Sequence, residues 1–149
     1  MSPFDWRTVL MAKHAQHVAL IHFPIALFIA AVALDLLGLW TKREDLATAG
    51  YINLSLAGLS LFPAILTGLA AWQWQLEGHR LEGVLLWHLL AACCSALIIW
   101  SSWWIHYRAR RRLRGSKPGW RVVLELAGVL VVALTGHLGG FLSGVNTNL

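Results

Sequence analysis

Three of the seven histidines lie inside long apolar segments, at matching depths from the segment ends. His22, His88 and His137 each lie about five residues, or roughly 7.5 Å of helix rise, from one face of a membrane. An ionisable side chain inside a bilayer is costly and usually marks a functional site. Imidazole nitrogens bind haem iron and transition metals. Three imidazoles at one depth on three helices therefore predict a layer of ligands.

Four apolar segments must position these histidines. The chain has 149 residues, of which 58% are hydrophobic and 13% charged, which is too apolar for a soluble domain of this size. Hydropathy predicts membrane-spanning helices at about 17–40, 50–72, 83–107 and 120–142. Because the connections are short, consecutive helices should be antiparallel neighbours. The expected fold is an all-α integral membrane protein, one antiparallel bundle of four transmembrane helices over residues 1–149.

Basic residues are unevenly distributed between the two faces of this bundle. The connections around Lys42 and between Arg108 and Arg121 carry nine of the twelve Lys and Arg residues. Cytoplasmic loops are enriched in these residues, so both termini should be non-cytoplasmic. The Arg108–Arg121 loop is also a candidate site for anionic lipid headgroups. No folded domain presents this basic run, and we therefore expect no nucleic-acid partner.

Periodicity predicts which helix faces point inward. Three stripes of small or polar residues recur at spacings of three and four, and we expect them to face the bundle: His22, Ala26, Ile29 and Ala33; Asn53, Ala57, Ser60, Ala64, Thr67 and Ala71; and His88, Ala92, Ser95, Ile99 and Ser102. On the last helix, Gly136 and Gly140 flank His137. Their missing side chains should admit either a porphyrin edge or a neighbouring helix.

A single bis-histidine haem b fits this layer best. Such a haem needs two imidazoles from different helices at one depth. Two of His22, His88 and His137 are therefore the expected axial ligands of the iron, with His17 in reserve. A zinc or copper site would also accept imidazoles, but such sites usually add thiolate, carboxylate or methionine ligands. Histidines that only hydrogen-bond between helices are the structural alternative.

Other polar residues lie near the two faces. His17, His79 and Arg80 surround the expected haem face, where a quinone headgroup is a further candidate ligand. Toward the other face, Glu125 follows Arg121 by one turn, and this spacing predicts a structural ion pair. Asp35 has no local partner, so an interhelix hydrogen bond is expected there, ahead of a proton route. His106 is expected to be an interfacial side chain.

Two motifs resemble a known family. The segment HVALIHFPIAL at 17–27 and the segment TGHLGG at 135–140, together with Asp35 and His88, are similar to the bacterial membrane-protein family filed as domain of unknown function 2231. This resemblance implies a four-helix protein of the bacterial cytoplasmic (inner) membrane. Relatives fused or adjacent to cytochrome domains imply an association with haem or redox chemistry.

These observations favour a b-type haem-binding subunit of a membrane redox complex. It would transfer electrons between a partner on the non-cytoplasmic side and the quinone pool. Two alternatives remain: a cofactor-free accessory subunit of a larger membrane complex, and a metal-handling membrane protein that uses the histidines. No serine, cysteine or carboxylate constellation predicts a nucleophile, so electron transfer is favoured over a stand-alone enzyme activity.

Overall fold

Four long helices make up the fold. The computed structural model describes residues 13–78, 80–111 and 119–143. Its helices are α2 (Lys13–Thr41), α3 (Glu44–Gln75), α4 (Gly83–Arg111) and α5 (Gly119–Leu142). Each is long and apolar enough to cross a membrane, and the described residues contain no strand. The prediction of an all-α bundle of four transmembrane helices is confirmed.

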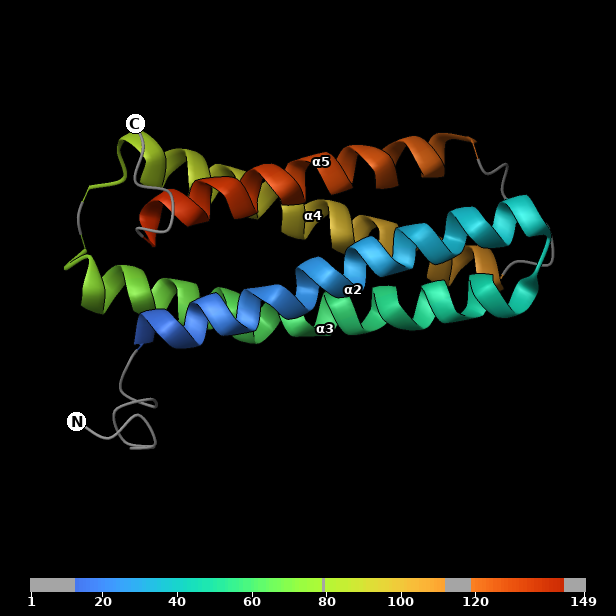
Figure 1. The fold of residues 1–149 in the computed structure, drawn as a ribbon, viewed down its shortest axis with the longest axis horizontal. Helices are drawn as coiled ribbons and strands as arrows, with labels where there is room; N and C mark the ends of the chain where they lie inside the picture. Colours follow the sequence, from blue (N-terminus) through green and yellow to red (C-terminus); the bar gives the residue numbers. More distant parts are fainter. Residues whose placement is uncertain (1–12, 79, 112–118, 144–149) are drawn as a thin grey trace.

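The helices form two hairpins, α2–α3 and α4–α5, which lie as two layers (Figure 1). Helices within each hairpin pack together more extensively than helices of different hairpins do. At one end of the bundle, α2 begins, α3 passes to α4, and α5 ends. We call this the histidine end, because it carries His17, His22, His88 and His137. The opposite end, which carries Arg108, Arg110, Arg111 and Arg121, is the arginine end.

Helices α2, α3 and α4 extend further than hydropathy predicts, and charged residues account for the extensions of α3 and α4. Helix α3 begins at Glu44 instead of near residue 50, and Glu44 and Asp45 occupy its first turn. Helix α4 continues to Arg111, and its last turn contains three arginines. Acidic residues at a helix start and basic residues at a helix end interact favourably with the helix dipole. The same charges end an apolar window early, so the hydropathy boundaries fall short.

A tight turn joins α2 to α3. Lys42 adopts a left-handed backbone conformation (φ 56°), and the Arg43 N–H donates to the Gly38 carbonyl at 3.1 Å. This pattern is a common helix C-cap. Arg43 also donates to both carboxylate oxygens of Asp45, and this hydrogen bond raises the pKa of the Arg43 guanidinium.

The apolar core lies in the middle of the bundle, where nine residues are buried: Phe28, Ala31, Val32, Leu54, Ala57, Leu61, Ala96, Ile99 and Val132. Gly128 makes room for the largest of them. A Cβ atom at Gly128 would lie 2.8 Å from Phe28 Cζ and 2.7 Å from Ile98 Cγ2, distances that real Cβ atoms do not tolerate. The missing side chain therefore allows α2, α4 and α5 to meet at this level.

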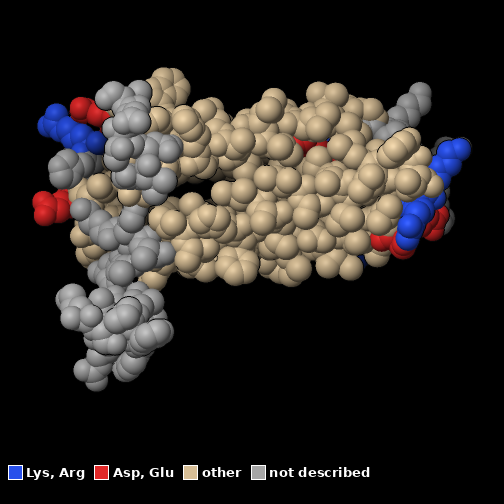
Figure 2. All heavy atoms as spheres, in the orientation of Figure 1, with Lys and Arg blue, Asp and Glu red and all other residues tan. Residues whose placement is uncertain are grey.

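The outer surface is that of a membrane protein. Lys, Arg, Asp and Glu gather at the two ends, and the surface between them is almost free of charge (Figure 2). Large apolar side chains are exposed along this middle region, including Leu66 at 67% and Leu130 at 73%. Such extensive exposed apolar surface requires an apolar solvent, so this belt contacts the lipid bilayer.

Candidate functional site

The three membrane-embedded histidines lie at similar levels along the bundle. Ile25 Cδ1 of α2 is 4.0 Å from the position that a Cβ would take at Gly136 of α5, and His88 Cε1 of α4 is 3.2 Å from that of Gly139. In antiparallel helices, His22, three residues before Ile25, lies at about the level of Gly139. Measured along the bundle axis, the levels of the three residues therefore differ by about one helical turn or less: His22, His88 and His137.

Helix α2 does not present His22 to the core. His22, Ala26, Ile29 and Ala33 are all exposed, and the helix instead buries Pro24, Phe28, Ala31, Val32 and Asp35. The predicted inward stripe on α2 is wrong. In a membrane helix both faces are apolar, so small residues alone do not identify the inner face. Gly128 of α5 leaves room for the ring of Phe28, and this contact fixes which face of α2 points into the bundle.

The stripes on α3 and α4 are placed as predicted. Three small residues of the α3 stripe are buried, and so are three residues of the α4 stripe: Ala57, Ala64 and Ala71, and Ser95, Ile99 and Ser102.

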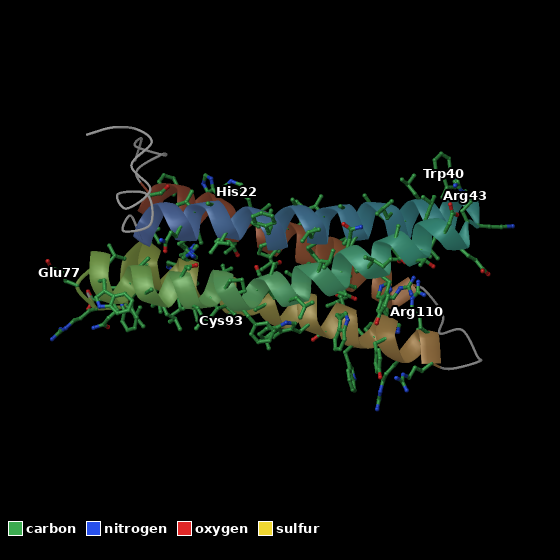
Figure 3. The ribbon with its side chains drawn as sticks, turned by 90° about the horizontal axis from the view of Figure 1, so that it is seen from below. His22, Trp40, Arg43, Glu77, Cys93 and Arg110 are labelled. Carbon is green, nitrogen blue, oxygen red and sulfur yellow. The ribbon has the colours of Figure 1, made fainter. Side chains whose placement is uncertain are left out.

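His22 is held in one orientation and one tautomer. Its Nδ1 lies 2.6 Å from the carbonyl oxygen of Val18 on the same helix. A carbonyl oxygen can only accept, so Nδ1 carries the proton, and the Nε2 of the neutral ring carries the lone pair. The side chain projects from α2 on the side away from α3 (Figure 3). A hydrogen bond from one ring nitrogen to a backbone carbonyl is the usual bracing of a metal-binding histidine.

His88 is braced in the same way but in a different place. Its Nδ1 lies 3.1 Å from the carbonyl oxygen of Thr135 across the α4–α5 interface, and its side chain is half-buried. The Thr135 hydroxyl lies 2.9 Å from the hydroxyl of Ser95. His88 thus lies on the side of α5 that faces α4.

The remaining candidates have distinct surroundings. His137 is exposed, and its ring meets the ring of Phe141 edge-on at 4.9 Å between centroids. His17 Nδ1 lies 3.3 Å from the hydroxyl of Thr67, which places the reserve ligand between α2 and α3. Gly140 accepts a hydrogen bond from the Ser143 hydroxyl at 3.1 Å. His79 lies outside the described residues, and Arg80 is exposed.

His22 and His137 flank the same line of contact. We call the contact between α2 and α5 around Ile25 and Gly136 the α2–α5 seam. On α5, Thr135 faces α4 and Gly136 faces α2, so the next residue, His137, lies at the outer edge of the seam. His22 precedes Ile25 by one turn and, like His137, is exposed, so both rings lie on the outward side of the seam. Between the two layers, the face in Figure 2 is hollowed toward the histidine end.

A buried polar cluster lies toward the arginine end. Arg121 donates to Asp35 Oδ2 at 2.8 Å, and His106 Nε2 lies 2.6 Å from Glu125 Oε1. Arg121 therefore pairs with Asp35 of α2. The helical spacing predicted a pair with Glu125 instead, and that prediction is wrong. His106 is 5% exposed, so its prediction as an interfacial side chain is also wrong. Asp35 does make the expected interhelix hydrogen bond.

The same cluster contains a possible ligand set that the sequence reading missed. One ligand atom each from Asp35, His106 and Glu125 lies within 4.8 Å of the others, and all three residues are buried. They come from α2, α4 and α5, so no local spacing connects them. A signal was present, however. The stripe that ends at Ser102 on α4 continues at the same spacing to His106, which identifies His106 as inward-facing.

Further polar bonds join the hairpins in this half of the bundle. Trp100 Nε1 donates to the Gly58 carbonyl at 3.1 Å, and Trp103 Nε1 donates to the Ser55 hydroxyl at 3.2 Å. Arg110 reaches from α4 to α3 (Figure 3), where it donates to the carbonyl of Ala47 and the hydroxyl of Thr48. These bonds hold α3 against α4.

A family model matches the part of the chain that forms these helices. The model described as "Predicted membrane protein (DUF2231)" matches residues 13–146. The chain belongs to this family. The match spans all four helices of this DUF2231 protein and confirms the resemblance seen in its two motifs. Comparison with curated proteins and with solved structures found no match.

Proposed function

We propose that this DUF2231 protein is a b-type haem-binding subunit of a membrane redox complex. It would carry electrons between a partner on the non-cytoplasmic side and the quinone pool. The observation that carries the proposal is the pair of exposed imidazoles, His22 and His137, at the edges of one seam in the membrane-spanning region. A polar ring exposed to lipid at this depth is costly, so a ligand or partner that covers both is favoured.

The residues around the seam fit a macrocycle. The lone pair of His22 is on Nε2, the nitrogen that faces away from its backbone brace. Gly136 brings no side chain to the contact between α5 and α2, and among the described residues Ile25 Cδ1 lies in ordinary van der Waals contact with its Cβ position, at 4.0 Å. Haem b would supply one-electron redox chemistry when bound. The residues of this chain would hold its iron, orient the ring and exclude water from it.

His22 and His137 are the two residues that would hold the haem iron. Both flank the α2–α5 seam, whereas His88 approaches α5 from the α4 side. His88 stays as the third candidate because it lies at the same level and is braced by a carbonyl. His17 is the weakest candidate, because it packs between α2 and α3. A quinone headgroup beside His17 and Arg80 would complete the electron path.

The proposal includes a location and an orientation. The protein would lie in the bacterial inner membrane, with the arginine end cytoplasmic and both termini non-cytoplasmic. Arg108 lies 5.2 Å from the ring centroid of Trp104, and Arg111 lies 4.9 Å from that of Tyr107. Guanidinium groups stacked on interfacial rings suit the recognition of anionic lipid headgroups.

Spectra of histidine variants test the ligand assignment. The full-length protein and its His22→Ala, His137→Ala and His88→Ala variants would be purified from haem-sufficient cells. We expect His22→Ala and His137→Ala to lose the low-spin spectrum, because the iron loses an axial imidazole, and His88→Ala to keep it. His14→Ala is the matched control and should match the wild type. A normal low-spin spectrum in all three variants would overturn the proposal.

One alternative rests on the same exposed face. A cofactor-free accessory subunit would cover His22 and His137 with another membrane protein instead of a haem. In that case the purified protein would show no visible absorption, and His22→Ala would weaken assembly with its complex. A metal-handling protein would instead retain zinc or copper in elemental analysis, with loss of the metal in the His22→Ala variant.

A further inference from the structure

The buried cluster at the arginine end has no role in the haem proposal. We propose that Asp35, His106 and Glu125 bind one divalent transition-metal ion. The three ligands come from α2, α4 and α5, so the ion would join three of the four helices. This site is separate from the histidine layer, and the proposal does not depend on whether a haem binds there.

The three side chains already lie close enough to share an ion. One ligand atom of each lies within 4.8 Å of the other two. His106 Nε2 and Glu125 Oε1 are 2.6 Å apart, whereas ligand atoms of one zinc ion, each about 2.0–2.2 Å from it, lie about 3 Å or more from each other. The ion would therefore take the place of this hydrogen bond, and the two side chains would move apart by less than about 1 Å.

The donor set indicates the class of ion. One imidazole with two carboxylates suits first-row divalent ions such as zinc, iron and manganese. Calcium would need six to eight oxygen ligands, and magnesium is rarely bound by an all-protein cage. Three protein ligands also leave one tetrahedral position open, as in zinc sites that keep a water or a substrate.

The charges of the ligands match a divalent ion. Asp35 and Glu125 are 3% and 2% exposed, and buried carboxylates need a compensating charge. Two of them neutralise one divalent ion. Arg121 adds a further positive charge, and its side chain is the most exposed of the cluster, at 13% against 6% for His106.

A second observation points to a ligand at this place. Among the described residues, Glu125 Oε2 is buried and has no hydrogen-bond partner. A buried anionic oxygen without a partner is unfavourable, and a metal ion would supply the positive partner that it lacks. Ser102 Oγ, one turn from His106, and Arg121 Nε are also buried without a partner in this part of the chain. The protein alone therefore does not satisfy every polar atom of the cluster.

Asp35 is fixed in place by two neighbouring helices. Arg121 of α5 donates to its Oδ2 at 2.8 Å, and metal-binding carboxylates usually accept a hydrogen bond of this kind. Gly50 of α3 packs against the backbone of the same turn, since a Cβ there would lie 3.3 Å from the Asp35 nitrogen. The carboxylate is thus positioned before an ion binds.

The ligands lie at one depth, close to the arginine end. Asp35 is six residues before the end of α2, His106 is five residues before the end of α4, and Glu125 is six residues after the start of α5. These separations correspond to roughly 7.5–9 Å of helix rise. Ionisable side chains at such a depth usually mark a functional site. An ion from the arginine end would reach them without crossing the apolar core.

Zinc binding to the purified full-length protein tests the proposal. After removal of metals with a chelator, we expect dialysis against Zn2+ to leave one tightly bound zinc in the cluster. The double variant His22→Ala/His137→Ala should keep this zinc. X-ray absorption at the zinc edge, recorded on this double variant, should show one imidazole among oxygen ligands.

Variants of the ligands locate the zinc. Loss of an outer-shell partner typically weakens metal binding about 10–100-fold, so loss of a ligand in Glu125→Gln or His106→Gln should weaken it by at least about 100-fold. Glu44→Gln is the matched control, because Glu44 is an exposed carboxylate at the same end, and it should bind zinc like the wild type.

Three results would overturn the proposal. The first is a folded wild-type protein that binds no zinc. The second is zinc coordinated by two or more imidazoles, or zinc lost in His22→Ala/His137→Ala, because the cluster has a single imidazole. The third is unchanged zinc affinity in a folded Glu125→Gln protein. The first two need no variant of the cluster to fold.

Discussion

The two ends of this bundle hold ionisable side chains in opposite ways. Toward the arginine end, Asp35, His106 and Glu125 are buried, and each has a partner on another helix. At the histidine end, His22 and His137 are exposed on membrane-spanning helices, and the hydrogen bond of His22 is to its own helix. At the arginine end, these side chains find their partners within the chain itself. The other end presents imidazole rings on the outer surface of membrane-spanning helices.

The polar bonds between the hairpins are also distributed unevenly between the two ends. Bonds from Trp100, Trp103 and Arg110 join α3 to α4, and the Asp35–Arg121 pair joins α2 to α5. Toward the histidine end the face shown in Figure 2 is hollowed between the layers, and among the described residues a Cβ at Gly136 would meet one side-chain atom within 4 Å. Among the described residues, the polar bonds between the hairpins therefore lie mainly in the arginine half.

The largest expected effect is the loss of a charge at the arginine end. Arg121→Ala leaves the buried Asp35 carboxylate uncompensated, and this should cost about 3–5 kcal/mol of unfolding free energy. Denaturation of the purified protein in detergent measures the loss. His22→Ala is the matched change at the histidine end and, with both variants compared in haem-free protein, should cost about 1 kcal/mol or less, as is typical of an exposed position. Equal losses in the two variants would contradict the division.

Two glycines of α5 provide the next comparison. Gly128→Leu forces a side chain against Phe28 and Ile98, and overpacking of this kind costs about 1–3 kcal/mol. At Gly136 a Cβ makes only an ordinary contact with Ile25, so in haem-free protein Gly136→Leu should change the free energy of unfolding less than Gly128→Leu does, while haem content falls. Gly140→Leu, one turn further along α5, should likewise lower the haem content. Haem content and folded yield, measured together, separate the two effects. A destabilised Gly136→Leu protein would mean that this glycine serves helix packing.

The smallest expected effect tests one of the bonds between the hairpins. Trp103→Phe removes the donor to the Ser55 hydroxyl but keeps an aromatic ring in place. One neutral hydrogen bond contributes about 1 kcal/mol, so the unfolding free energy should fall by that amount. Haem content should not change. A parallel loss of haem would show that the two ends are coupled.

The sequence predicts the fold well and the site only in part. Hydropathy identifies four spans because a bilayer demands about 20 apolar residues for each, and the depth of the histidines follows from the spans. The rotation of α2 is not predictable in this way, because lipid and core are both apolar. The Asp35–Arg121 and His106–Glu125 pairs join residues far apart in the chain, and only the packing of α2, α4 and α5 brings them together. The one-turn spacing of Arg121 and Glu125 therefore predicted an ion pair that these two residues do not form.

The most direct test of the central claim is the reduced-minus-oxidised visible spectrum of the purified wild-type protein, with haem quantified per folded chain. The claim is that the histidine end binds a haem b. The account predicts a low-spin b-type spectrum with one haem per chain, unchanged in Trp103→Phe. A folded protein from haem-sufficient cells that shows no such spectrum would contradict it.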